Sequence, residues 1–227
     1  MTYQVIFCGI DGVVMASDKR AGTYRPKDNN IVPGNDECKI LISGEFAWAY
    51  SGGEIAKSFS HHFEPMLKRK QDLSDVELFQ LIQDCRVPAF EDWKQAAESD
   101  SGSANSVILV RGSSKKIFRI NPLPGMNTDT EPTQKGRCFA GQLYNTASFL
   151  FHRLHSPDMP LSALIPLAVY SVRAAGSFDS SAIDGLTIAV YRDSAGQFQF
   201  YDAPICREDT EGLDKLIRQA ITKHFTV

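Results

Sequence analysis

Apolar residues in the first fifty positions fall into four short runs that turn residues separate. The runs cover residues 3–8, 13–17, 39–43 and 46–50, and the turn signals between them are Asp11-Gly12, Pro33-Gly34-Asn35-Asp36 and Gly44-Glu45. Such short β-rich runs predict antiparallel strands. Because the runs are nearly continuous in apolar residues, we expect both faces of these strands to be covered by further layers.

The apolar spacing changes to a helical period after Gly53. One face consists of Ile55, Phe59, His62, Phe63 and Met66, and a second, behind Ser74, consists of Val76, Phe79, Leu81 and Ile82. These faces predict two helices, and residues 91–97 predict a further short one. Residues 106–111 and 116–120 then predict a hairpin. Residues 121–135 predict a loop because they are rich in Pro, Thr and Gly.

The second half of the chain repeats this alternation of helices and strands. Helical faces fall in residues 143–154, 164–175 and 213–224, and strand patterns fall in residues 186–191 and 198–203. The order of elements suits two packed antiparallel sheets with helices on both outer faces. The chain has 227 residues, 43% of them hydrophobic, so it can bury one large core. We expect a single α+β domain over residues 1–227.

Composition excludes several classes of function. The net charge of -3 and the pI near 6.0 give no basic field for nucleic acid. The chain has no basic leader and no stretch of about eighteen apolar residues, so we expect a cytoplasmic protein that does not enter a membrane. The five cysteines are widely spaced and include no Cys-x-x-Cys pair. Neither a disulfide framework nor a zinc site is therefore expected.

Two histidine pairs, His61-His62 and His152-x-x-His155, raise the question of a metal site. Histidines three apart on a helix face the same side and can share a metal. No carboxylate or cysteine completes either pair at a recognised spacing. We expect no metal and no other cofactor.

Thr2 comes directly after Met1, and removal of Met1 would make it the N-terminal residue. An N-terminal threonine carries a nucleophile and a base on one residue. Its hydroxyl attacks, and its free α-amine, with a pKa of about 7.7–8.0, takes the proton at neutral pH. Threonine is also a common second residue, so Thr2 by itself does not identify a nucleophile.

Residues 9–21, Gly-Ile-Asp-Gly-Val-Val-Met-Ala-Ser-Asp-Lys-Arg-Ala, resemble the opening of proteasome β-type subunits, which are N-terminal nucleophile hydrolases. Asp18 lies sixteen residues after Thr2 in an Ala-x-Asp-x-Arg-Ala setting, as the acidic residue of that family does. Lys39 stands at the head of the next apolar run, where the family places a lysine. The resemblance extends over most of the chain, apart from about residues 68–106, and implies a four-layer αββα sandwich of two antiparallel sheets.

The resemblance implies a catalytic role for each of these side chains. Thr2 would attack a peptide carbonyl, and Lys39 would stabilise the developing alkoxide and disfavour protonation of the amine. Asp18 would hold the Lys39 ammonium in place, and Arg20 is a candidate supporting residue. Asp179 falls where the family keeps an aspartate near the amine of the nucleophile.

The same resemblance assigns the oxyanion donor to the backbone N–H of Gly53 or Gly52, and counting from Lys39 favours Gly53. Two supporting serines of the family are replaced, by Ala182 and Gln142. Ser181 could take one role after a shift of one residue. The Gln142 amide can donate a hydrogen bond, but it cannot relay a proton. We therefore expect a weak or narrowly specific hydrolase.

The leading hypothesis is a self-compartmentalising threonine peptidase. Stacked homo-oligomeric rings of six or seven subunits would enclose the threonines, peptides or unfolded proteins would be the substrates, and an unfolding ATPase is a candidate gatekeeper. Two alternatives stay open: a catalytically inactive ring that serves as a scaffold or peptide-binding chamber, and an N-terminal nucleophile amidase that acts on a small molecule. All three share one fold, so the fold cannot choose between them.

Overall fold

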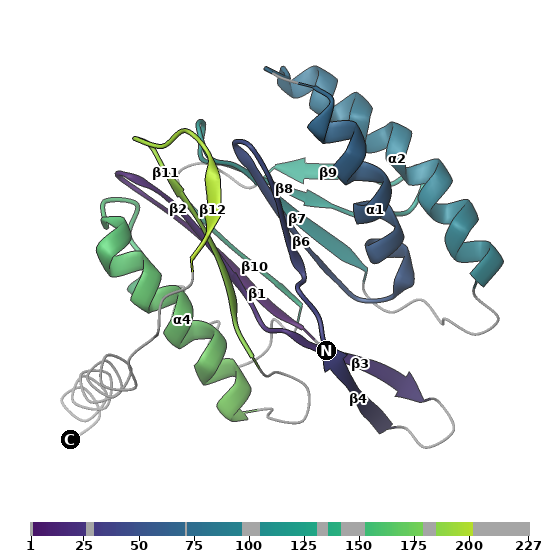
Figure 1. Ribbon diagram of the computed structural model, residues 1–227, viewed down its shortest axis with the longest axis horizontal. Coiled ribbons are helices and arrows are strands. Elements are labelled where there is room, and N and C mark those ends of the chain that lie inside the picture. Colours follow the sequence, from purple (N-terminus) through teal and green to yellow (C-terminus); the bar gives the residue numbers. More distant parts are fainter. Residues whose placement is uncertain are drawn as a thin grey trace.

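Two antiparallel sheets lie face to face with helices on both outer sides (Figure 1). The computed structural model describes residues 2–25, 30–70, 72–96, 105–130, 136–141, 153–178 and 185–201. This arrangement confirms the predicted α+β sandwich of layers in the order αββα.

The first sheet has the strand order β10-β1-β2-β11-β12. Its strands are β1 (Tyr3–Gly9), β2 (Gly12–Ser17), β10 (Arg137–Gly141), β11 (Thr187–Arg192) and β12 (Phe198–Phe200). Strands β1 and β2 are buried along their whole length, as their nearly continuous apolar runs predict. The tight β1–β2 hairpin sets Gln4 opposite Ser17, so the residues just before β1 and just after β2 meet at one end of the sheet.

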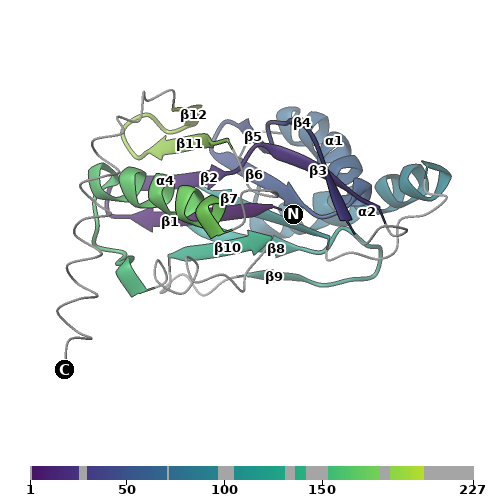
Figure 2. The ribbon, with the colours of Figure 1, turned by 90° about the horizontal axis from the view of Figure 1, so that it is seen from below.

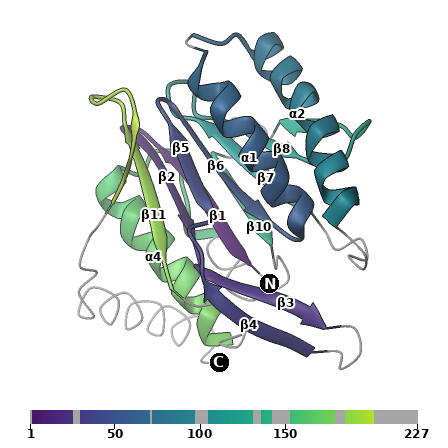
Figure 3. The ribbon, with the colours of Figure 1, turned by 45° about the vertical axis from the view of Figure 1, so that its right-hand side comes forward.

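The second sheet has the strand order β5-β6-β7-β8-β9, and Figure 2 shows the strands of both sheets from below. Its strands are β5 (Ile40–Ser43), β6 (Phe46–Ser51), β7 (Ser106–Arg111), β8 (Lys116–Ile120) and β9 (Thr128–Thr130). Two further strands, β3 (Arg20–Arg25) and β4 (Asn30–Asp36), form a separate ribbon that projects from the sandwich in Figure 3.

Helices α1 (Glu54–Lys68) and α2 (Asp75–Ala96) cover the second sheet, and α4 (Leu161–Phe178) covers the first. Ser74 and Glu77 form a reciprocal capping box at the start of α2: the Ser74 N–H donates to the Glu77 carboxylate at 2.8 Å, and the Glu77 N–H donates to Ser74 Oγ at 3.3 Å. No helix in the described ranges is long and apolar enough to cross a membrane.

Three apolar layers hold the sandwich together. One layer packs α4 on the first sheet, one packs α1 and α2 on the second, and the third lies between the sheets. The middle layer includes Ile6 and Met15 from the first sheet and Ala47, Ile108 and Val110 from the second, all fully buried. Both faces of both sheets are therefore covered.

Several predicted elements differ from the structure. The short helix expected at residues 91–97 is the end of α2, which continues through Pro88 to Ala96. Val76, expected on the buried face of that helix, is 78% exposed, and Leu78, Leu81 and Ile82 face the core. The loop expected at residues 121–135 contains β9. Strands β3, β4 and β10 were not predicted. Residues 143–152 of the helix predicted at residues 143–154, and the whole helix predicted at residues 213–224, lie outside the described residues.

Candidate active site

The Lys39 ammonium is the centre of a buried polar cluster between the two sheets. Its Nζ donates to Thr2 Oγ1 at 3.1 Å, to Asp18 Oδ2 at 2.7 Å and to the backbone oxygen of Arg20 at 2.6 Å. An ammonium group has three N–H donors, so these three acceptors satisfy it completely. The structure thus brings together Thr2, Asp18 and Lys39, three residues that sequence reasoning selected.

The strand ends explain why these residues meet. Thr2 directly precedes β1, Asp18 comes directly after β2, and Lys39 directly precedes β5 of the opposite sheet. Two hydrogen bonds join the open ends of the β1–β2 hairpin. The Asp18 N–H donates to the Tyr3 carbonyl at 3.2 Å, and the Tyr3 N–H donates to Asp18 Oδ1 at 2.8 Å. One oxygen of Asp18 is therefore fixed by the backbone while the other faces Lys39.

The cluster is almost completely removed from solvent. The exposed fraction is 8% for Thr2, 0% for Asp18 and 4% for Lys39. Burial raises the pKa of Asp18 above its ordinary value, and the nearby Lys39 and the Tyr3 N–H act in the opposite direction. A hydroxyl next to a buried ammonium is a site where a developing alkoxide would be stabilised electrostatically.

Gly141, at the end of β10, fixes the backbone of Thr2. It pairs with Tyr3 across the β1–β10 ladder and lies at φ +86, in the left-handed region that favours glycine. A Cβ at this position would lie 1.8 Å from the Thr2 carbonyl oxygen. Sequence reasoning used this segment only to place Gln142. The contact depends on pairing with a distant strand, which the sequence pattern does not reveal.

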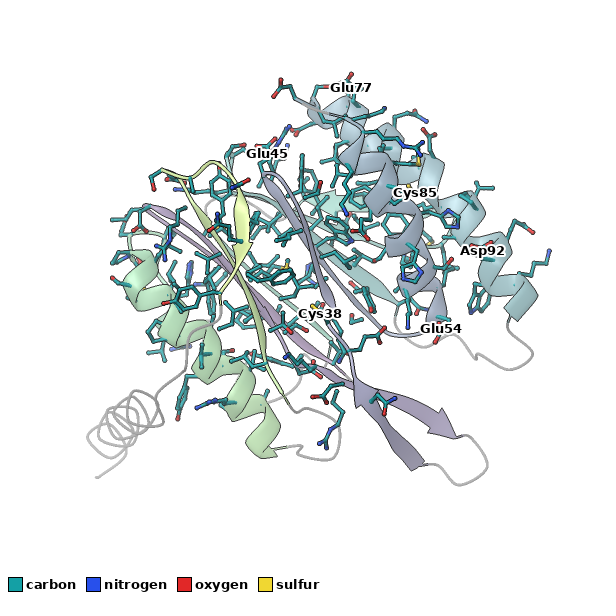
Figure 4. All side chains as sticks on the ribbon, in the orientation of Figure 1. Cys38, Glu45, Glu54, Glu77, Cys85 and Asp92 are labelled. Atoms are coloured by element: carbon teal, nitrogen blue, oxygen red, sulfur yellow. The ribbon has the colours of Figure 1, made fainter. Side chains whose placement is uncertain are left out.

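The candidate oxyanion donors lie where β6 turns into α1. Gly52 comes directly after β6 at φ +101, and Gly53 is the N-cap of α1. Gln4 ties this turn to β1, because its buried side-chain amide donates to the carbonyl of Tyr50 at 2.6 Å. Figure 4 labels Cys38 and Glu54, the sequence neighbours of Lys39 and Gly53. Both labelled residues lie on the side of the sandwich where Figure 1 marks the N-terminus.

The Gly53 N–H donates to Asn105 Oδ1 at 2.5 Å. Sequence reasoning selected neither Asn105 nor Gln4, because no motif singles out an isolated amide side chain. Arg20 enters the cluster through its backbone oxygen. Asp179, Ser181 and Gln142, the remaining predicted residues, lie outside the part of the chain that the structure describes.

Two of the described histidines, His62 and His155, have local partners. His62 Nε2 contacts Asp92 Oδ2 at 2.6 Å, and the buried His155 stacks on Phe7 and donates from Nε2 to the Cys8 carbonyl at 2.9 Å. Within the described ranges, no three His, Cys, Asp or Glu side chains gather as metal ligands do.

No family model matches the chain, and no curated protein matches it in sequence. Solved structures do match it. An Anbu (Gly-1) mutant from Hyphomicrobium sp. strain MC1 aligns with a TM-score of 0.70 at 17% identity, over 98% of this chain and 97% of its own. Anbu, described as an ancestral β-subunit, from Yersinia bercovieri aligns with a TM-score of 0.69 at 17% identity, over 97% of this chain and 96% of its own.

The eukaryotic HslV from Trypanosoma brucei aligns with a TM-score of 0.56 at 15% identity, over 84% of this chain and 99% of its own. The chain has the fold of the proteasome-like N-terminal nucleophile hydrolases. This confirms the fold that the resemblance to proteasome β-type subunits implies. At these identities the likeness concerns the proteasome-like fold, so the chemistry has to be argued from the residues themselves.

Proposed function

We propose that the chain is a threonine-type peptidase of proteasome β-subunit type, with Thr2 as its nucleophile after removal of Met1. One observation carries the proposal: the buried Lys39 ammonium donates to Thr2 Oγ1 at 3.1 Å while Asp18 holds its other side at 2.7 Å. A positive charge fixed beside the Thr2 hydroxyl favours its deprotonated form.

The reaction needs no metal and no organic cofactor. The free α-amine of Thr2 accepts the hydroxyl proton, Thr2 Oγ1 bonds to the substrate carbonyl carbon, and the scissile C–N bond breaks as the leaving amine takes up a proton. Water then attacks the ester, which releases the second product and restores Thr2. Lys39 stabilises the alkoxide and disfavours protonation of the amine, and the Gly53 N–H binds the oxyanion.

Asp179 and Ser181 are proposed to orient the freed amine, with Gln142 as a further donor. Peptides and unfolded polypeptides are the proposed substrates. The proposal also includes a cytoplasmic location, as the sequence predicts.

Hydrolysis of fluorogenic peptides tests this function. The wild-type protein should cleave at least one substrate of a diverse peptide set, Thr2→Ser should retain part of the activity, and Thr2→Ala should lose it. Serine keeps a hydroxyl and an α-amine on one residue, whereas alanine keeps only the amine. Hydrolysis that persists in Thr2→Ala would remove Thr2 from the reaction.

Protonation of the buried Asp18 should add an acid limb to the pH dependence of the reaction, besides the limb of the α-amine. Because burial raises the pKa of Asp18 above 3.8, the carboxylate takes up its proton at a higher pH than an exposed aspartate does. As pH falls through that value, Lys39 loses its charged partner and the rate of Thr2 labelling by a peptide epoxyketone should fall. Above it, Asp18 stays charged and this limb is flat.

Labelling rates measured from about pH 4 to about pH 9, a range that includes the titration of an α-amine, check this expectation. Asp18→Asn should react slowly throughout and should lack the lower limb, because asparagine has no proton to take up. A lower limb that survives in Asp18→Asn would assign that titration to another group.

We also propose that the chain self-associates. The Anbu complex from Pseudomonas aeruginosa, which aligns with a TM-score of 0.68 at 16% identity, forms a helical assembly. Stacked rings of six or seven copies are the proposed form here, and an unfolding ATPase is the proposed partner. Light scattering should give a multiple of the 25.2 kDa chain mass, and electron microscopy separates a closed ring from an open helix. A monomer at all concentrations would contradict the proposal.

The alternative is an assembled but inactive scaffold. Ala182 and Gln142 favour it, because they stand where the family carries serines that orient the amine and relay its proton. Retention of Met1 in the assembled protein would favour this alternative over the peptidase.

A further inference from the structure

The backbone N–H that the proposed function assigns to the oxyanion already has a hydrogen-bond partner. Gly53 N lies 2.5 Å from Asn105 Oδ1, which is shorter than an ordinary N–H···O bond. A backbone N–H can only donate, so the facing atom of the Asn105 amide is its oxygen. The donor is therefore engaged by the protein itself when no substrate is present.

The position of Asn105 results from the sheet register. Ser106, the first residue of β7, pairs with Ser51, the last residue of β6. Asn105 therefore lies beside the point where the chain leaves β6 through Gly52 at φ +101. Gly53 has no side chain that could accept the free N–H groups in the first turn of α1. Its own N–H is accepted by Asn105, the residue directly before β7.

We propose that Asn105 is a displaceable acceptor for the Gly53 N–H, and that the carbonyl oxygen of a substrate must take its place before Thr2 can react. This inference rests on the proposed function. A single N–H makes one strong linear hydrogen bond, so the Asn105 amide and a substrate carbonyl compete for it.

The competition changes as the reaction proceeds. In the ground state the two acceptors are both neutral amide oxygens of similar strength. In the tetrahedral intermediate the substrate oxygen is charged, and hydrogen bonds to charged acceptors are about twice as strong as neutral ones. The exchange of Asn105 for substrate therefore favours the transition state over the bound ground state. Asn105 acts as a positioning residue that suppresses reaction with weakly bound substrates.

Removal of the competing amide should speed the reaction. Asn105→Ala is expected to raise the second-order rate of Thr2 labelling by a small peptide epoxyketone about fivefold, the factor that corresponds to one ordinary net hydrogen bond. Asn105→Asp keeps the shape of the side chain but places a charged, stronger acceptor on the same N–H. It is expected to lower the rate at least about tenfold.

Asn121→Ala is a matched control. The Asn121 Oδ1 also accepts a backbone N–H, that of Leu123 at 3.0 Å, in the segment after β8. The control removes the same kind of bond outside the candidate site, so it should leave the labelling rate unchanged. Melting temperatures of all three variants show whether a change in rate reflects a change in stability.

Amide hydrogen exchange at Gly53 gives a readout that does not depend on activity. If the Gly53 amide exchanges faster in Asn105→Ala than in the wild type, the hydrogen bond from the Gly53 N–H to Asn105 is supported. Equal exchange rates would overturn it. A second outcome would overturn the displacement alone: the wild type is labelled, and Asn105→Ala is labelled more slowly at an unchanged melting temperature. The proposed peptidase would still hold in that case. If neither the wild type nor the variants are labelled, both the proposed peptidase and the displacement are wrong. The exchange rate of the Gly53 amide still shows whether Asn105 accepts its N–H.

Discussion

Replacing Lys39 with methionine should lower the labelling rate of Thr2 by about a thousandfold and destabilise the fold by about 3–5 kcal/mol. The loss of rate is expected because the substitution removes the only side-chain cation in contact with Thr2 Oγ1 among the described residues. The loss of stability is expected because Asp18, which is 0% exposed, becomes an unpaired charge in the core. Methionine has a similar length, so packing should change little.

The double variant Asp18→Asn/Lys39→Met separates the two effects. The asparagine oxygen can still accept the Tyr3 N–H at the position of Asp18 Oδ1, and no charge remains buried. Chemical denaturation should show most of the stability restored, while labelling stays absent. A Lys39→Met protein that is as stable as wild type and reacts at a similar rate would show that the cluster has neither effect.

Gly141→Ala should lower the labelling rate at least about a hundredfold, because it displaces the nucleophile by pushing on its backbone. The added Cβ would lie 1.8 Å from the Thr2 carbonyl oxygen, so β1 or β10 has to move. Displacements of about 1 Å at a reacting group are sufficient for losses of this size. The melting temperature should fall as well, since the strand pairing of Tyr3 with Gly141 is disturbed.

Gly125→Ala controls for backbone strain. Gly125 also lies in the left-handed region, at φ +74, but nothing stands within 4 Å of an added Cβ. That variant should lose only about 1–2 kcal/mol of stability, the cost of the left-handed conformation, and should keep its labelling rate. If the two alanine variants behave alike, strain rather than contact with Thr2 explains the effect of Gly141→Ala.

The buried ion pair of Asp18 and Lys39 is better explained by a role in the reactivity of Thr2 than by a contribution to the stability of the fold. Taking Asp18 and Lys39 out of water costs several kcal/mol for each ion, and their attraction often does no more than offset this cost. The protein nevertheless arranges three acceptors around the Lys39 ammonium and two donors around the Asp18 carboxylate. One of the three acceptors is a hydroxyl at the start of the chain, which a purely structural pair would not need.

The strands that define the sandwich could be read from local pattern. Apolar runs at residues 3–8, 13–17 and 46–50 correspond closely to β1, β2 and β6, because these strands are buried along their length. Strand β10 was not predicted, because its position is set by pairing with β1 rather than by a local turn signal. The capping box at Ser74 marks the start of α2, but local pattern did not show that the helix passes Pro88.

Some residues of the candidate site could likewise be predicted from the sequence, and others could not. Thr2, Asp18 and Lys39 could be selected from spacing and family resemblance, and the structure places Thr2 and Asp18 within hydrogen-bond distance of the Lys39 ammonium. Asn105 and Gly141 could not be selected, because their importance comes from strand register. Asn105, directly before β7, and Gly141, at the end of β10, contact the site from segments that are distant in sequence.

Whether Thr2 is an N-terminal nucleophile can be decided from the intact mass of the assembled protein before and after treatment with a peptide epoxyketone. This reagent requires both the hydroxyl and the free amine of an N-terminal threonine. We expect a chain that lacks Met1 and gains the mass of one inhibitor, and a Thr2→Ala chain that gains none. A chain that retains Met1, or one that loses it and stays unlabelled when fully assembled, would contradict the proposed peptidase and favour the inactive scaffold.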